Sequence, residues 1–169
     1  GGDDFINSYM ANEPIPSHLI DAGDGNDFVH ITHTKEGQEV LQYLEVVDGG
    51  SGNDTIAFST YPDAPISYVI NTGNTQNFEN IYSYRGDDYL VGSSDNNIIT
   101  GNIGEDVIYG QAGNDTIYGS FAPDSEEYIH QAVGGNSYLL YEESNTLYGG
   151  EGDDVLYGGK GDDILFGGP

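Results

Sequence analysis

The sequence predicts an all-β solenoid, and three observations lead to that prediction. A nine-residue phrase of glycines, an aspartate and an aliphatic residue recurs along the chain, as in the stretch GGEGDDVLYGGKGDDILF near its end. Three strand-forming residues follow each aspartate, and only the middle one is consistently aliphatic. No segment combines helix caps with an apolar helical stripe. Each phrase is therefore expected to form a turn and a short strand, so that two phrases complete one rung.

Numbering the phrase so that the aspartate is sixth and the aliphatic residue eighth places the copies in one register. The sixth positions fall at Asp88, Asn97, Asp106 and Asp115, and the register resumes at Asn145, Asp154 and Asp163. The eighth positions are Ile81, Leu90, Ile99, Ile108, Ile117, Leu147, Leu156 and Leu165. Residues 78–169 are thus expected to form the regular part of the solenoid.

Residues 1–77 are expected to form an irregular N-terminal portion of the same solenoid. Isolated copies occur at residues 1–6, 22–29 and 49–57. Residues 7–20 contain two prolines and are expected to form a loop, whereas residues 28–48 are expected to form two longer strands. Asp27 and Asp54 are three phrases apart, so these strands would be longer rungs. A further strand is expected at 67–70.

Residues 120–144 interrupt the array with a predicted loop. Asp124 keeps the nine-residue spacing after Asp115, but Glu126 occupies the aliphatic eighth position. The chain is expected to bulge out near residues 123–131. Such an insertion is either a tolerated surface loop or part of a binding face.

The charge of the chain excludes some partners and requires others. The 169 residues include 29 Asp and Glu against 3 Lys and Arg, a net charge of −26. This charge repels nucleic acid and anionic membranes, and it opposes compaction unless cations bind. With no Cys, disulfides and thiolate metal sites are excluded. No run of about 18 apolar residues occurs, so no membrane span is expected.

The turn chemistry predicts calcium as the missing cation. Glycines allow a tight turn whose carbonyl oxygens point inward, and the sixth-position carboxylate adds a further hard oxygen ligand. Oxygen ligands without Cys suit Ca²⁺. The alternative is an ordinary β-turn in which the aspartate caps its own backbone. That alternative does not explain a nine-residue period.

The phrase resembles the G-G-x-G-x-D-x-U-x nonapeptide of RTX (repeats-in-toxin), hemolysin-type calcium-binding proteins. The resemblance covers residues 78–119 and 145–168, with single copies at 1–6, 22–29 and 49–57. It implies a right-handed parallel β-roll, or β-helix solenoid, with several Ca²⁺ ions between stacked turns. The candidate metal-site residues are Asp4, Gly23, Gly25, Asp27, Gly50, Gly52, Asp54, Gly86, Asp88, Gly101, Gly104, Asp106, Gly110, Gly113, Asp115, Gly149, Gly150, Gly152, Asp154, Gly158, Gly159, Gly161 and Asp163.

Turns on the same side of the roll are expected to pair at a spacing of two phrases. This predicts the pairs Asp88/Asp106, Asn97/Asp115 and Asn145/Asp163. The first pair brings two carboxylates and should bind more tightly, because ligand charge sets affinity. The Asn97 turn lacks two glycines and is either metal-free or uses Asp95.

The ninth position carries aromatic residues that are expected to face outward: Tyr109, Tyr118, Tyr148, Tyr157 and Phe166. They either pair across strands or form a contact surface for polysaccharide, self-association or a neighbouring domain of the same chain. His30 and His33 fall on opposite strand faces, so joint zinc ligation is not expected.

The resemblance implies a secreted bacterial protein, exported unfolded by type I secretion, that folds in external Ca²⁺ at an extracellular or cell-surface location. No catalytic motif or nucleotide-binding loop occurs, so we expect no enzyme activity in these residues. The chain begins and ends within repeat phrases and is interpreted as part of a longer protein. Two functions remain open: a structural or adhesive segment of a large surface protein, and the calcium-dependent module of a secreted protease, lipase, epimerase or hemolysin-like toxin.

Overall fold

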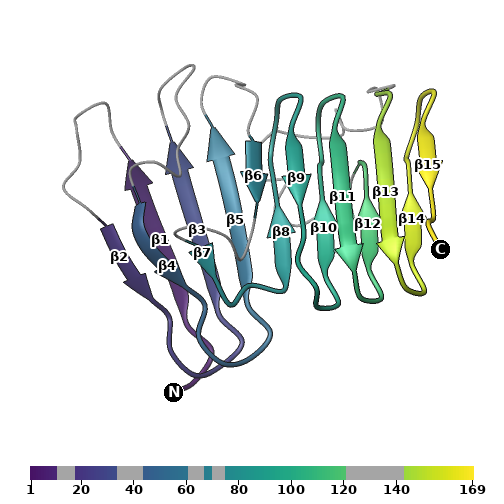
Figure 1. Cartoon of the computed structure of the whole chain (residues 1–169). Helices are drawn as coiled ribbons and strands as arrows, with labels where there is room; N and C mark the ends of the chain where they lie inside the picture. The colour runs from purple at the N-terminus through teal and green to yellow at the C-terminus, as the bar shows by residue number, and fades with distance from the viewer. Residues whose placement is uncertain (11–17, 34–43, 61–66, 70–74, 121–142) are drawn as a thin grey trace.

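The chain folds as a flattened parallel β-solenoid. The computed structural model describes residues 1–10, 18–33, 44–60, 67–69, 75–120 and 143–169, in which every regular element is a strand (Figure 1). In the described part of the chain, no helix has the length and hydrophobicity to cross a membrane. The all-β parallel architecture predicted from the repeat is confirmed.

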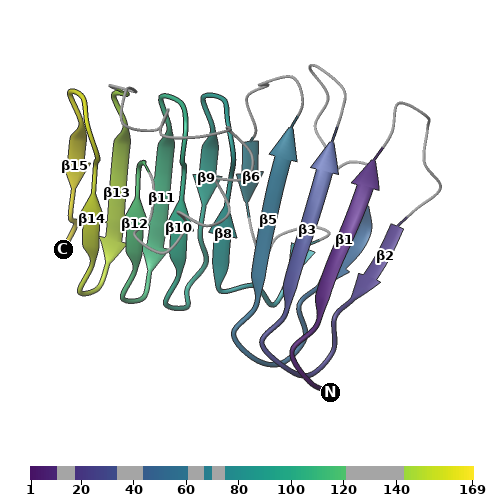
Figure 2. The ribbon, with the colours of Figure 1, turned by 180° about the vertical axis from the view of Figure 1, so that it is seen from behind.

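One face of the solenoid is a long sheet of seven parallel strands in the order β1-β3-β5-β8-β10-β12-β14. These strands are β1 (Phe5–Met10), β3 (Phe28–His33), β5 (Thr55–Thr60), β8 (Asn80–Tyr82), β10 (Ile98–Thr100), β12 (Thr116–Tyr118) and β14 (Val155–Tyr157). Every second strand of the chain, with one exception near β6, returns to this sheet. The chain therefore advances by one rung at each return (Figure 2).

The opposite face consists of two shorter parallel sheets. A three-stranded sheet contains β2 (His18–Asp21), β4 (Leu44–Asp48) and β7 (Thr75–Gln76). A five-stranded sheet contains β6 (Ser67–Val69), β9 (Tyr89–Val91), β11 (Val107–Ala112), β13 (Thr146–Glu151) and β15 (Ile164–Phe166). The change of sheet divides the roll into wide rungs at the N-terminal end and narrow rungs at the C-terminal end (Figure 1).

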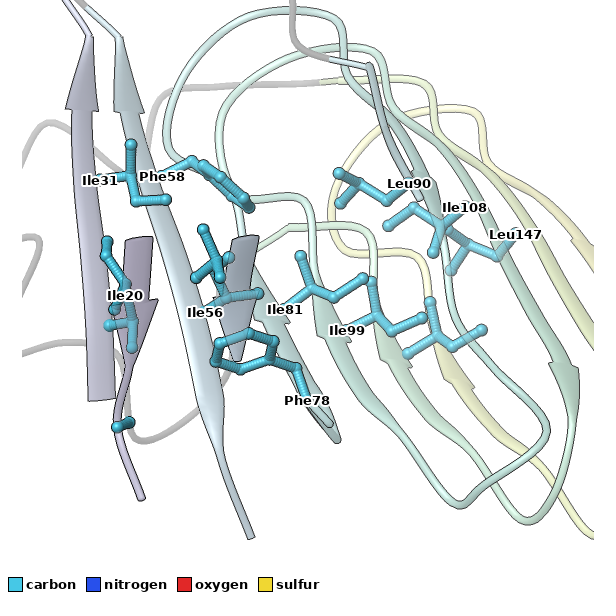
Figure 3. Close-up of a cluster of buried hydrophobic side chains, with 14 residues drawn as sticks. Ile20, Ile31, Ile56, Phe58, Phe78, Ile81, Leu90, Ile99, Ile108 and Leu147 are labelled. Atoms are coloured by element: carbon cyan, nitrogen blue, oxygen red, sulfur yellow. The ribbon is translucent and has the colours of Figure 1, made fainter. Parts of the chain in front are cut away.

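The core is one continuous cluster of apolar side chains that both faces contribute, with Ile81 and Ile99 from the long sheet lying opposite Leu90, Ile108 and Leu147 from the five-stranded sheet (Figure 3). In the six narrow strands from β8 to β13 the eighth-position residue is buried, as the repeat predicts: Ile81, Leu90, Ile99, Ile108, Ile117 and Leu147 are all 0 % exposed. Leu156 in β14 is only partly buried. The wide strands bury two side chains each, Val29 and Ile31 in β3 and Ile56 and Phe58 in β5. At the last rung Leu165 is exposed because no further rung covers it.

The wide rungs confirm one expectation about the N-terminal portion and correct another. Asp27 and Asp54 are 27 residues apart and lie in adjacent rungs, since β3 pairs with β5 in register. The expected strands within 28–48 and at 67–70 are present as β3, β4 and β6. The loop expected over residues 7–20 is wrong at both ends, because β1 continues to Met10 and β2 begins at His18. Pairing with β3 and β4 stabilises these ends despite the nearby prolines.

The interruption of the repeat is inserted within one turn. On its N-terminal side, Gly119 donates a backbone hydrogen bond to Tyr157, as in an uninterrupted rung. On its C-terminal side, the Asn145 N–H donates to the Asp163 carboxylate at 2.9 Å. Partners across this junction are 39 residues apart, instead of the 18 found elsewhere in the narrow rungs. The bulge predicted at residues 123–131 lies outside the described residues.

The outward-facing aromatic rings stack on one another along the sheets. Tyr109 and Tyr148 have ring centroids 4.5 Å apart and planes within 1° of parallel. The Tyr148–Phe166 and Tyr118–Tyr157 pairs are each stacked at 4.8 Å. Cross-strand pairing, one of the two interpretations of the ninth position, is therefore confirmed.

Candidate metal centre

The turns of successive rungs stack into two columns, one along each long edge of the roll. The first column contains the turns that end at Asp4, Asp27, Asp54, Glu79, Asn97, Asp115 and Asp154, and each leads into a strand of the long sheet. The second column contains the turns that end at Asp88, Asp106, Asn145 and Asp163, each of which leads into the five-stranded sheet.

The strand register confirms that the predicted sixth-position pairs are neighbours. Asp88 adjoins Asp106, Asn97 adjoins Asp115, and Asn145 adjoins Asp163, because the strands that follow them are paired in register. The structure adds neighbours that the nine-residue count did not predict across the irregular regions: Asp4/Asp27, Asp54/Glu79, Asp106/Asn145 and Asp115/Asp154.

Glycine is required at two kinds of turn position. At the second and fourth positions the backbone has positive φ, for example +96° at Gly50 and +152° at Gly52. A Cβ on either residue would overlap the carbonyl oxygen of Gly23 or Gly25 in the preceding turn. These close approaches let the turns stack at the spacing of the strands.

The first-position glycines make room for the carboxylates. A Cβ on Gly101 would overlap the Oδ2 atom of Asp106, and the same relation holds for Gly110 with Asp115 and Gly149 with Asp154. Their φ angles are not positive, so the reason for glycine here is space rather than backbone conformation. Each carboxylate is therefore turned into the hollow of its own turn.

One oxygen of each sixth-position carboxylate links adjacent turns. The N–H of the earlier sixth residue donates to the carboxylate Oδ1 of the later one, at 2.8 Å for Asp88 to Asp106 and 2.7 Å for Asp27 to Asp54. Glu79 accepts in the same way from the Asp54 N–H at 2.7 Å. This ladder sets the register of the turns but uses only half of each carboxylate.

In five of these carboxylates the other oxygen has no hydrogen-bond partner in the described part of the chain. Among the described residues, buried Oδ2 atoms without a partner occur in Asp27, Asp54, Asp106, Asp115 and Asp154. A buried anionic oxygen without a partner costs several kcal/mol in a medium of low dielectric constant. A cation in the turn would remove that cost, and the inward carbonyl and carboxylate oxygens are hard ligands that suit Ca²⁺.

The pKa values report the same cost of desolvation. Burial raises the pKa of the Asp106 carboxyl to about 8, and the neighbouring Asp88 and Glu143 carboxylates add to the shift. Burial likewise raises the pKa of Asp115 to about 6, with Asp154 contributing. Without a cation, the Asp106 carboxyl therefore favours its protonated form at neutral pH, and cation binding at this turn would release the proton.

A second ladder runs in the opposite direction through the fifth positions. Here the N–H of the later residue donates to the side chain of the earlier one, at 2.9 Å for Asn53 to Asn26 and 2.7 Å for Asn114 to Asn96. These side chains lie at the exposed rim of the turns. Because these side chains, whether amide or carboxylate, are exposed, this ladder holds adjacent turns together at no cost in buried charge.

Glu79 is a site residue that the sequence analysis missed. It occupies the sixth position two residues before Ile81, but the search was for aspartate or asparagine. Counting back from the buried Ile81 would have identified it. Its longer side chain still reaches the Asp54 N–H, so the ladder continues across the change from wide to narrow rungs.

The Asn97 turn is closed by its own side chains. The Asn97 Oδ1 accepts a hydrogen bond from the Ser93 N–H at 2.7 Å, and its Nδ2 donates to the Glu79 carbonyl at 3.1 Å. The amide thus fills the hollow that a carboxylate leaves open in the other turns. Of the two alternatives for this turn, the geometry favours the metal-free one.

Side chains alone do not form a metal centre in the described residues. No group of three or more His, Cys, Asp or Glu side chains converges there. A site in these turns would therefore combine one or two carboxylates with main-chain carbonyls. His30 lies away from the turns, and its Nε2 is 2.8 Å from the Ser59 Oγ.

The model of the RTX calcium-binding nonapeptide repeat matches in four copies, at residues 45–57, 82–117, 91–124 and 141–169. Together these ranges span just over half of the chain. The chain belongs to the RTX calcium-binding repeat family. RTX repeats bind Ca²⁺, which is the cation that the turn geometry fits. No curated protein and no solved structure matches the chain significantly.

The matched ranges coincide with the most regular turns of the RTX roll. The copy at residues 45–57 includes the Asp54 turn, although that turn lies among the wide rungs. The Asp4 and Asp27 turns fall outside the matched ranges but continue the same ladder. The column of turns therefore extends beyond the stretch that sequence matching detects.

Proposed function

We propose that the paired turns of both columns bind Ca²⁺ and that this binding folds the chain into its roll. The supporting observation is the row of buried Oδ2 atoms that lack hydrogen-bond partners in Asp27, Asp54, Asp106, Asp115 and Asp154. The proposed ligands are the sixth-position carboxylates, with Glu79 replacing one aspartate, and the carbonyl oxygens of the turn glycines. The Asn97 turn is proposed to hold no ion.

The net charge makes folding and metal binding a single event. At a net charge of −26, compaction without counterions brings many like charges together. A preformed calcium site does not exist in the unfolded chain, so the free energy of Ca²⁺ binding contributes directly to folding. The apolar core, with one or two buried side chains per strand, is too thin to offset that repulsion easily.

We infer that the protein is secreted and folds outside the cell. Cytosolic Ca²⁺ is scarce, so the carboxylates would keep the chain extended before export. Extracellular calcium modules bind with Kd values on the order of 10⁻⁴–10⁻³ M, which external Ca²⁺ satisfies. We propose export by type I secretion to the medium or the cell surface, which the resemblance to RTX proteins implies.

We propose that the module has a structural or adhesive role. The sequence contains no catalytic motif, and its solenoid presents flat sheets with stacked aromatic rings. The alternative is a calcium-dependent module that supports a secreted enzyme or toxin. Stacking covers the ring faces within each row, so a polysaccharide would find free ring faces only at the ends of the rows.

The first test is circular dichroism of the metal-stripped chain during titration with Ca²⁺, with Mg²⁺ as the control. We expect a cooperative transition from disordered chain to β-structure with Ca²⁺ alone. A chain that is already folded in chelator, and that does not respond to Ca²⁺, would contradict the proposal.

A matched pair of variants separates site binding from general charge screening. Asp115→Asn keeps an acceptor for the Asn97 N–H but removes a buried charge, whereas Asp153→Asn removes an exposed charge one turn later. We expect the first variant to need more Ca²⁺ to fold and the second to behave like the wild type. Equal shifts in the two variants would indicate screening alone.

A further inference from the structure

The turn that carries the insertion departs from the repeat at two positions. Its sixth residue is Asn145 instead of aspartate, and its fourth position is occupied by Glu143 instead of glycine. The main chain of Glu143 confirms this assignment, because its N–H donates to the Lys160 carbonyl at 3.1 Å. A Cβ on Gly161, the fourth residue of the next turn, would overlap the Glu143 carbonyl oxygen.

The Glu143 side chain is buried and points to the preceding turn. Glu143 is 8 % exposed, although glutamate at a turn is normally solvated. Its carboxylate lies close enough to the main chain of Gly104, the fourth residue of the turn that ends at Asp106, for the Gly104 N–H to lower its pKa, which opposes the rise from burial. The carboxylate therefore lies at the junction between the Asp106 and Asn145 turns.

At this junction the sixth positions provide only one charge. Asn145 accepts the ladder hydrogen bond from the Asp106 N–H at 2.9 Å, so the amide preserves the register. Asp106 is 1 % exposed; its Oδ1 accepts from the Asp88 N–H at 2.8 Å, and its Oδ2 has no partner. The second carboxylate that the sixth position lacks here is present two residues earlier, in Glu143.

We propose that Glu143 provides the carboxylate that Asn145 lacks, so that Asp106, Glu143 and turn carbonyls bind a Ca²⁺ ion of their own. This inference rests on the proposed function, namely that the stacked turns bind Ca²⁺. The inference assigns Glu143, which does not fit the nonapeptide pattern, as a ligand between the Asp106 and Asn145 turns. The ion would also join the Asp106 turn to Glu143, where the chain returns to the roll after the insertion.

The electrostatics of the junction agree with this assignment. Burial raises the pKa of the Glu143 carboxyl, and the nearby carboxylates of Asp87 and Asp163 raise it further. Two buried carboxylates repel each other unless a cation lies between them.

The test is a count of bound Ca²⁺ ions by native mass spectrometry of the calcium-loaded chain. Glu143→Gln keeps the size and shape of the side chain but removes the charge. Glu105→Gln, on the exposed rim of the Asp106 turn, makes the same chemical change outside the junction. We expect Glu143→Gln to bind one ion fewer than the wild type and Glu105→Gln to bind the full number.

A double variant tests whether the two positions compensate for each other. Glu143→Gln combined with Asn145→Asp restores a sixth-position carboxylate, and we expect the lost ion to return. A full set of ions in Glu143→Gln would overturn the inference, and so would a loss that the double variant fails to reverse. A wild-type chain that binds no Ca²⁺ would instead overturn the proposed function.

Discussion

The two ends of the roll use the same kind of turn but bury different amounts of apolar surface. The N-terminal rungs are wide, and the C-terminal rungs are narrow. A wide strand such as β3 has 6 residues and buries Val29 and Ile31, whereas a narrow strand such as β10 has 3 and buries only Ile99 as its apolar residue. Burying one such side chain contributes about 1.5–3 kcal/mol. The wide strands therefore gain about twice as much from the hydrophobic effect per turn.

This difference shows how one repeat can be stabilised in two ways. In a solenoid, stability is approximately a sum over rungs and over their interfaces. Where the core stabilises a rung less, the turns must stabilise it more. Ca²⁺ bound in the turns would provide that stabilisation. The narrow rungs are also those that the RTX repeat model matches most continuously. We therefore expect calcium dependence to increase from the N-terminal to the C-terminal end of the roll.

The largest expected effect comes from removing Ca²⁺ gradually. As free Ca²⁺ falls, the amides of β10, β12 and β14 should lose protection from hydrogen exchange before those of β3 and β5, because their rungs bury less apolar surface. Hydrogen-exchange mass spectrometry across a chelator series would measure this order. Simultaneous loss at both ends would mean that the core difference does not matter.

Truncation of the core should have the next largest effect. With saturating Ca²⁺, Ile99→Ala should lower the free energy of unfolding by about 2–5 kcal/mol, since it removes the one buried apolar side chain of its strand. Ile31→Ala should cost less, because Val29 remains buried in the same strand. Urea denaturation would measure both.

The control for this comparison is Ile98→Ala in the same narrow strand. Ile98 is 39 % exposed and faces outward, so its truncation should change stability much less. If Ile31→Ala proved as costly as Ile99→Ala, the proposed difference between wide and narrow rungs would fail.

A smaller effect is expected from pH in the absence of metal. The Asp106 pKa rises from 3.8 to about 8 in the folded chain, so folding binds protons. The resulting stabilisation is full below about pH 3.8 and is lost as the pH rises through 8. The metal-free chain should thus gain β-structure on acidification within this window, while its Ca²⁺ affinity falls. Circular dichroism in chelator at several pH values would show a flat response if these carboxyls were solvated.

The smallest expected effect concerns the aromatic stacks. Tyr148 stacks on both Tyr109 and Phe166, and each stacked pair contributes about 0.5–1.5 kcal/mol beyond its burial. Tyr148→Leu should therefore lower the stability of the narrow rungs modestly. Tyr89→Leu, which removes only a tilted contact at 5.5 Å, should do so less. Thermal unfolding of both variants at saturating Ca²⁺ would rank them, and the opposite order would count against stacking.

Much of the site followed from the repeat because its period is local and strict. Once Asp88 and Asp106 were two phrases apart, parallel stacking required them to be neighbours, and the register agrees. The pairs among the wide rungs were harder to predict. Their longer strands interrupt the nine-residue period, so the Asp54/Glu79 pair was not found. The strands at Phe5–Met10 and His18–Asp21 were partly missed because pairing partners far along the chain, and not local propensity, stabilise them.

The sequence by itself determined the all-β class, the parallel repeat, the buried eighth position and the choice of cation, because each depends on residue type at a fixed local spacing. Only the tertiary structure decided that the insertion lies inside one turn, that Oδ1 links the turns while Oδ2 lacks a partner, and that Glu143 reaches the Asp106 turn. These features depend on which residues of distant rungs lie against one another. Such contacts carry no period, so they become visible only when the rungs are stacked.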